Sequence, residues 1–152
     1  MKVYIMRHGK AEYSASSDSV RKLTAEGKAE CFAVAQHFHD NSISFDLALV
    51  SPYLRAQESF AVVADIIAVN QIEAEQQLVP GGNPAHVADY LRALALSTDV
   101  QSVLIVSHLP LVGYLVHELC SAIPAPMFST ADVACVSLSK EGKGSVEWFL
   151  HQ

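Results

Sequence analysis

Two arginines and two histidines stand at the ends of three apolar runs, and their side chains are suited to handling phosphate. Arg7 and His8 end the first run, Arg55 follows the second through a Ser-Pro step, and His108 ends the third. Each run has the composition of a buried strand, and open α/β sheets bind ligands outside the carboxyl ends of their strands. Arginine presents a fork of donors that matches phosphate oxygens, and an imidazole nitrogen can act as a nucleophile. The sequence therefore predicts a pocket for a tetrahedral anion that contains a nitrogen nucleophile.

The positions of these residues give each a role in phosphoryl transfer. His8 is the candidate nucleophile, which would attack phosphorus in line and hold the phosphoryl group as phosphohistidine. Nearby arginines disfavour its protonation in the empty site, and a backbone carbonyl on its other ring nitrogen would fix the tautomer. His108 would donate a hydrogen bond to an equatorial oxygen and stabilise charge in the transition state.

Each signal has a simpler explanation when it is taken alone. Arg-His-Gly after a strand is also an ordinary polar turn, Arg55 could be a solvated residue at a helix start, and His108 a hydrogen-bonded histidine at a strand end. The functional interpretation is favoured because all of these residues lie where apolar runs end, and because helix N-termini already attract anions.

Length and charge restrict the class of protein. A chain of 152 residues fits one domain, 1–152, and can bury a core without metals or disulfides. The formal net charge of −6 argues against a nucleic-acid partner, because phosphate backbones are bound by basic surfaces. Only four arginines occur, so two or three of them at one sheet edge would make a local positive pocket.

Cysteine usage and the absence of long apolar runs indicate a soluble cytoplasmic protein. Cys31, Cys120 and Cys135 are far apart without metal-ligand spacing, which indicates reduced, buried thiols. Arg7 and His8 interrupt the N-terminus before a secretory signal could form, and no apolar run is long enough to span a membrane. We therefore expect no membrane contact, no metal and no cofactor, and a small single domain is compatible with a monomer.

Periodicity and turn signals predict an alternation of strands and helices. The predicted strands are 2–6, 45–50, a short edge strand within 72–79, 102–106, and a hairpin of 133–138 and 145–150. The predicted helices are 25–40, 52–68, 85–96 and 110–120. This order indicates a single three-layer α/β domain, with a mixed, mainly parallel central sheet flanked by helices on both faces.

The motifs together resemble the histidine phosphatase superfamily (the phosphoglycerate-mutase-like group), and within it the small SixA-type protein-histidine phosphatases. The resemblance covers essentially the whole chain. It is carried by the segments Met-Arg-His-Gly-Lys at 6–10, Leu-Thr-Ala-Glu-Gly at 23–27, Val-Ser-Pro-Tyr-Leu-Arg-Ala at 50–56, and Val-Ser-His-Leu-Pro-Leu-Val-Gly at 106–113.

The resemblance implies roles for five residues. His8 falls on the phosphorylated histidine of such enzymes, and Arg7, Arg55 and His108 fall on residues that bind the phosphoryl oxygens. Arg21, just before the Leu-Thr motif, resembles a further phosphate contact of the small members. From the residues alone, Arg21 and its neighbouring lysine could simply be a solvated pair.

One departure from the family pattern bears on the substrate. Many relatives that cleave phosphate esters carry a carboxylate that protonates the leaving oxygen, whereas the corresponding segment 78–84 offers none. The branch of the family with His-Asp at the second histidine is also excluded, because Leu109 follows His108. Without an acid, an alkoxide leaving group would react about 10²–10⁴-fold more slowly. Imidazole is a good leaving group, so the absence of a proton donor fits a phosphoramidate substrate, in which a P–N bond is broken. Glu58 and His86 remain candidate donors, expected at the surface.

The expected function is hydrolysis of phosphohistidine on a signalling or phosphocarrier protein, through a covalent phosphohistidine on His8. The partner would be a phosphotransfer domain or a phosphocarrier, because the resemblance and the short chain imply an open site without a large capping insertion. One alternative is a phosphatase or mutase for small phosphate esters, with Glu58 or His86 as proton donor. Another is a non-catalytic module that binds phosphohistidine proteins.

Overall fold

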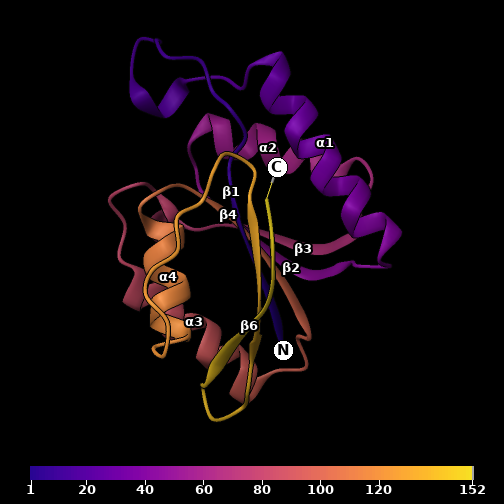
Figure 1. Cartoon of the computed structure of the whole chain (residues 1–152), viewed down its shortest axis with the longest axis vertical. Helices are drawn as coiled ribbons and strands as arrows, with labels where there is room; N and C mark the ends of the chain where they lie inside the picture. Colours follow the sequence, from indigo (N-terminus) through magenta and orange to yellow (C-terminus); the bar gives the residue numbers. More distant parts are fainter. Residues whose placement is uncertain (152) are drawn as a thin grey trace.

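One six-stranded sheet with four α-helices forms the computed structural model of the chain, which describes residues 1–151 (Figure 1). Gln152, the last residue of the predicted domain, lies outside the described residues. The strands are β1 (Lys2–Arg7), β2 (Phe45–Val50), β3 (Val69–Ala74), β4 (Ser102–Ser107), β5 (Val133–Leu138) and β6 (Gly144–Leu150). The helices are α1 (Ala25–Asp40), α2 (Leu54–Ala64), α3 (Pro84–Ser97) and α4 (Leu111–Leu119), with short 3₁₀ turns η1 (Asp18–Val20) and η2 (Gln76–Leu78).

The sheet has the order β3-β2-β4-β1-β5-β6, and its first four strands run parallel. β5 pairs antiparallel with β1, and β6 pairs antiparallel with β5 at the edge of the sheet. The register pairs Arg7 with Ser107 and Val50 with Val106, so β1, β4 and β2 end side by side. The predicted mixed, mainly parallel sheet is confirmed, and its three apolar strands deliver their carboxyl ends to one edge.

Two hydrophobic cores cover the two faces of the sheet. α1 and α2 pack on one face, while α3 and α4 pack on the other, as Figure 1 shows. Side chains alternate across a strand, so Val3 and Ile5 of β1 join the core under α3 and α4, whereas Tyr4 and Met6 join the core under α1 and α2. This confirms the predicted three-layer arrangement. No helix within residues 1–151 is long and apolar enough to cross a membrane.

The boundaries predicted for α2 and β3 are wrong. The predicted helix 52–68 is shorter at both ends, because α2 spans Leu54–Ala64, and the edge strand begins at Val69 rather than within 72–79. Residues 66–69 are apolar, and a short apolar run fits helix and strand equally well by period. Tertiary structure decides: Val69 pairs with Phe45 at the start of β2, which places it in the sheet.

Two glycines allow the segment after β1 to cross the start of α1 closely. A Cβ on Gly27 would lie 2.1 Å from the backbone oxygen of Lys10, and a Cβ on Gly9 would lie 2.6 Å from the backbone oxygen of Gly27. Thr24 caps the helix at this point by accepting a hydrogen bond from the Gly27 amide at 3.0 Å. The crossing holds the backbone beside His8 against α1.

We predict that Gly27→Ala destabilises the protein although alanine is the better helix former. The gain in helix propensity is about 1 kcal/mol. The clash with rigid backbone outweighs this gain, so we expect a net loss of about 1–3 kcal/mol in the free energy of unfolding, measured by urea denaturation. Gly81→Ala is the matched control, because nothing lies within 4 Å of a Cβ added there. Equal denaturation midpoints for the two variants would contradict the prediction.

Candidate active site

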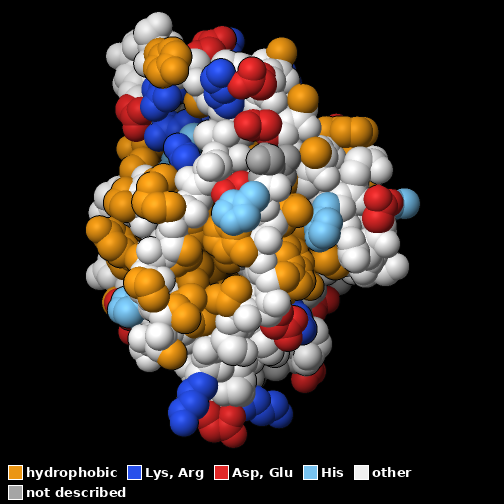
Figure 2. Space-filling view, viewed as in Figure 1, with side chains coloured by type: hydrophobic (Ala, Val, Ile, Leu, Met, Phe, Trp, Pro, Cys, Tyr) orange, Lys and Arg blue, Asp and Glu red, His pale blue; other side chains and the backbone are white. Residues whose placement is uncertain are grey.

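The predicted site residues meet at the carboxyl ends of β1, β2 and β4. Backbone hydrogen bonds continue beyond the paired strands, from His8 N to Ser107 O at 2.9 Å and from Ser51 N to Val106 O at 3.0 Å. A pocket of about 340 Å³ opens at this edge, and it is lined by Arg7, His8, Lys10, Ala11, Tyr13, Arg21 and Thr130. Figure 2 shows Lys and Arg side chains gathered at the upper left of the molecule, beside the segment that joins β1 to α1.

His8 is held as a neutral imidazole whose lone pair lies on Nε2, where Arg55 contacts it. Its Nδ1 lies 2.7 Å from the backbone oxygen of Gly9, which accepts the Nδ1 proton as predicted. Nε2 therefore carries the lone pair, and Arg55 Nε donates to it at 3.3 Å. Burial lowers the pKa of His8 to about 4, with smaller contributions from Arg55, Arg7 and Arg21. The predicted effect of the arginines is confirmed, although burial is the larger cause.

His108 lies against His8, with the two ring centroids 5.0 Å apart. Its side chain is buried, and burial together with the neighbouring His8 lowers its pKa to about 3. Nε2 is 2.7 Å from the hydroxyl oxygen of Ser51, while Nδ1 has no hydrogen-bond partner among residues 1–151. His108 thus has one ring nitrogen engaged by the protein and one that is buried without a partner in the described part of the chain.

Arg55 is oriented by a residue that the sequence analysis did not single out. Its NH1 donates to the backbone oxygen of Asp18 at 2.7 Å, and its NH2 donates to a carboxylate oxygen of Asp18 at 3.2 Å. The guanidinium also lies over the Tyr53 ring, 5.1 Å from its centroid. These contacts leave Nε of Arg55 directed at His8. The sequence signal for Asp18 was slight: an acidic residue three positions before Arg21.

Arg21 and Arg7 line the pocket, whereas Arg55 and His108 are not among its lining residues and lie against the His8 ring. Arg21 donates from NH1 to the Asp18 carboxylate at 2.9 Å and from Nε to Glu12 O at 2.7 Å, so it does not form the alternative solvated pair with Lys22. Arg7 donates from NH1 to Phe128 O at 2.9 Å, and its Nε is buried without a partner in the described part of the chain.

This arrangement suits a tetrahedral anion better than any other ligand class. Two neutral imidazoles are buried among three guanidinium groups, of which Asp18 neutralises only part. A group with several negatively charged oxygens would accept hydrogen bonds from the arginines, with its central atom next to the His8 lone pair. Within residues 1–151, no group of three or more His, Cys, Asp or Glu side chains is placed to hold a metal ion.

The two candidate proton donors named from the sequence lie outside this pocket. Glu58 accepts a hydrogen bond from the Leu23 amide at 2.9 Å, so it supports the loop before α1 and is not the solvated charge that was expected. His86 is exposed, as predicted, and lines a separate hollow together with Glu73 and Tyr90. Neither residue is among those that line the His8 pocket.

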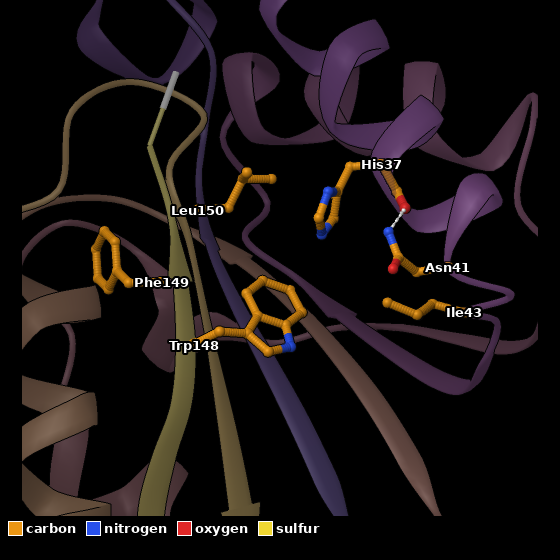
Figure 3. A pocket seen from close by; sticks show the side chains of 6 residues that line it. All are labelled: His37, Asn41, Ile43, Trp148, Phe149 and Leu150. Atoms are coloured by element: carbon orange, nitrogen blue, oxygen red, sulfur yellow. Dashed lines mark hydrogen bonds between the residues drawn. The ribbon is translucent and has the colours of Figure 1, made fainter.

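A hollow of about 210 Å³ between the end of α1 and β6 is mainly apolar (Figure 3). His37 and Trp148 meet edge to face there, with ring centroids 5.3 Å apart. Phe149 points to the opposite side of β6 from Trp148 and Leu150, as Figure 3 shows. No Lys or Arg lines this hollow, so it does not share the anion-binding chemistry of the His8 pocket.

The burial of His8 and His108 predicts a loss of stability as the pH falls below 6.5. In the folded protein these imidazoles stay neutral until about pH 4 and pH 3, whereas in the unfolded chain they take up protons near the usual value of 6.5. The unfolded state therefore binds more protons in this window, and the free energy of unfolding falls with falling pH.

Between pH 7.5 and pH 4.5, we expect the free energy of unfolding of His8→Asn to fall by about 2–3 kcal/mol less than that of the wild type, as measured by urea denaturation. His86→Asn, which removes an exposed imidazole, is the control. Equal losses in the wild type and His8→Asn would show that His8 takes up its proton at a similar pH in both states.

Comparison with known proteins connects this geometry to a family. Residues 3–79 match the model of the histidine phosphatase superfamily, branch 1. The phosphohistidine phosphatase SixA of Escherichia coli (strain K12) is 43% identical over 149 residues, which cover 97% of this chain and 92% of that protein. A SixA homolog of Haemophilus influenzae is 42% identical over 160 residues, which cover 100% of this chain and 95% of the homolog.

A solved structure shares the whole fold. The protein histidine phosphatase SixA complexed with tungstate matches with a TM-score of 0.96 at 42% identity, covering 99% of this chain and 97% of that one. The family model spans the strand that delivers Arg7 and His8 as well as the helix that carries Arg55. The chain belongs to the histidine phosphatase superfamily, branch 1.

Proposed function

We propose that this protein is a phosphohistidine phosphatase that hydrolyses phosphohistidine on another protein, with His8 as the covalent nucleophile. The observation that carries the proposal is the His8 ring itself: Gly9 holds Nδ1, and Nε2 presents a lone pair to a pocket lined with arginine. The likeness to phosphohistidine phosphatase SixA over nearly the whole chain supports the same activity. The relative solved with tungstate, a tetrahedral oxyanion, supports a phosphate-shaped ligand.

In the first step, Nε2 of His8 attacks phosphorus and forms a new N–P bond. The bond between phosphorus and the substrate imidazole breaks, and that imidazole leaves with the electron pair. Arg7, Arg55 and Arg21 hold the phosphoryl oxygens, and His108 donates to one of them as charge develops. Because the pKa of His8 is lowered to about 4, the ring needs no deprotonation before it attacks at neutral pH.

In the second step, water attacks the phosphorus of phospho-His8. The Nε2–P bond breaks, inorganic phosphate leaves, and His8 regains its lone pair. The same arginines hold the phosphoryl group throughout, so the site does not need to rearrange between the two steps.

The site is suited to a leaving group that departs without a strong acid. Asp18 contacts Arg21 and Arg55, and both arginines lower its pKa, so it is ionised at neutral pH and holds no proton to donate. Glu58 and His86 do not line the pocket. Imidazole can leave after arriving protonated or taking a proton from water, which favours phosphohistidine over phosphate esters.

A phosphotransfer domain or a phosphocarrier is the partner class that we propose. The pocket lies open beside Tyr13, whose side chain is 92% exposed, so a histidine displayed on a folded protein can approach it. The formal net charge of −6 does not favour nucleic acid. Three free, buried cysteines fit a reducing compartment, and we propose a cytoplasmic location.

Single-turnover mixing with a ³²P-phosphohistidine protein tests the covalent step. We expect acid-labile, alkali-stable label to appear on the wild-type protein and then to be released as phosphate. His8→Ala removes the nucleophile, so label transfer should vanish and release should fall by at least about 10³-fold. His86→Ala, which removes a histidine outside the pocket, should behave as the wild type.

Three results would overturn this assignment. Undiminished release by His8→Ala would indicate direct attack by water. Binding of the phosphoprotein without label or release in the wild type would identify a non-catalytic binding module. Label retained without release would show a phosphocarrier rather than a phosphatase.

Substrate preference gives a second test of the same site. Without a proton donor, the kcat/KM for an alkyl phosphate should lie about 10²–10⁴-fold below the value for phosphohistidine. Glu58→Gln and His86→Ala should leave this ratio unchanged, since neither residue lines the pocket. Comparable rates on both substrates, lost on removing Glu58 or His86, would instead establish a phosphate-ester phosphatase.

A further inference from the structure

The two ring nitrogens of His108 have different surroundings. Nε2 lies 2.7 Å from the Ser51 hydroxyl oxygen, whereas Nδ1 has no hydrogen-bond partner among residues 1–151. His108 is 1% exposed and Ser51 is fully buried. A neutral imidazole carries one proton, so its position decides whether the free Nδ1 offers a ligand a donor or a lone pair.

The hydrogen bonds of Ser51 determine which nitrogen holds the proton. The Ser51 oxygen accepts from the Tyr53 amide at 3.2 Å, so its own proton needs a separate acceptor. Within the described chain, the acceptor in hydrogen-bond reach of that proton is Nε2 of His108. A buried hydroxyl proton left without an acceptor is unfavourable. The hydroxyl therefore donates to Nε2, and the ring proton of His108 resides on Nδ1.

We propose that Ser51 is a positioning residue that keeps His108 as the Nδ1–H tautomer, so that Nδ1 donates a hydrogen bond to the phosphoryl group on His8. This inference rests on the proposed function for the identity of the acceptor. The tautomer itself follows from the contacts of Ser51 in the absence of any ligand.

The chemistry of the pocket explains why the tautomer matters. With the opposite tautomer, Nδ1 would direct a lone pair at a negatively charged phosphoryl oxygen, and the contact would be repulsive. His8 and His108 are both neutral and hold the same Nδ1–H tautomer, but the protein engages a different nitrogen of each: Nδ1 of His8 through Gly9 and Nε2 of His108 through Ser51. On His8 the lone pair lies on Nε2, which accepts from Arg55 in the unliganded site and attacks phosphorus in the reaction. On His108 the proton lies on Nδ1, which has no partner among residues 1–151 and can donate to oxygen.

The backbone around Ser51 holds its hydroxyl in place. Its amide donates to the backbone oxygen of Val106 at 3.0 Å, and Val106 lies two positions before His108. Its carbonyl accepts a hydrogen bond from the Gln57 side chain at 2.8 Å. Ser51 thus links the end of β2 to the end of β4 through both backbone and side chain. Its hydroxyl acts on the phosphoryl group through His108 and not directly.

The ring ¹⁵N chemical shifts of His108, recorded at neutral pH without substrate, test the tautomer. His108→Gln identifies the signals by their loss. We expect a protonated Nδ1 and an unprotonated Nε2 in the wild type. A wild type with the proton on Nε2 would overturn the inference whatever the activity of the protein, and this measurement does not depend on any variant folding.

Substitutions at Ser51 then test its part in setting the tautomer. Ser51→Ala removes the donor, so the His108 proton should shift toward Nε2 and kcat for phosphohistidine should fall about 10–100-fold, with little change in KM. Ser51→Cys keeps a weaker donor, so its kcat and its fraction of the Nδ1–H tautomer should lie between those of the wild type and those of Ser51→Ala. The matched control is Ser107→Ala, which removes a fully buried hydroxyl that donates to Leu78 O at 2.7 Å instead of to a ring. It should keep the Nδ1–H signals.

The outcomes separate this inference from the proposed function. A Ser51→Ala protein that keeps the Nδ1–H tautomer would contradict the role of Ser51, even if its activity falls. A wild type with the Nδ1–H tautomer but without phosphatase activity would refute the proposed function and leave the Ser51 contact standing.

Discussion

Parallel pairing of β1, β4 and β2 is the constraint on which the rest of the structure depends. His8, Ser51 and His108 come from three separate segments, and backbone bonds from His8 N to Ser107 O and from Ser51 N to Val106 O hold those segments in register. A slip of one residue would turn the side chains of a strand to the opposite face. The two apolar cores on either side of the sheet prevent such a slip, so core packing indirectly sets the distance between the two imidazoles.

Burial and positive charge act together on the two histidines. Burial is the main reason that both stay neutral, and the arginines add to it. Neutral imidazoles can be held in chosen tautomers, which charged ones cannot. Asp18 complements this arrangement, because it binds the terminal nitrogens of Arg55 and NH1 of Arg21. Nε of Arg55 is then left to contact His8.

The sequence was most informative where local signals agree. The bounds of α1 and β2 match the prediction, because Thr24 is a strong helix cap and because 45–50 is apolar except for Asp46 and is bounded by polar residues. The end of α2 and the start of β3 were wrong, because the apolar residues 66–69 fit either period. Glu58 was expected to be solvated, but the folded chain brings the Leu23 amide to α2, where it donates a hydrogen bond to the Glu58 carboxylate.

Sequence alone determined which chemical groups stand at the ends of three strands, because an apolar run followed by a polar junction is a local pattern. It thereby located Arg7, His8, Arg55 and His108 at one edge and indicated an anion site. Tertiary structure decided the contacts of Asp18 with Arg55 and of Ser51 with His108, which join residues 37 and 57 positions apart. Such contacts depend on strand register and on the path of a loop over the sheet edge. No local pattern encodes these, so the protonated nitrogen of His108 emerges only from the folded chain, whereas the acceptor for His8 is the carbonyl of the neighbouring Gly9.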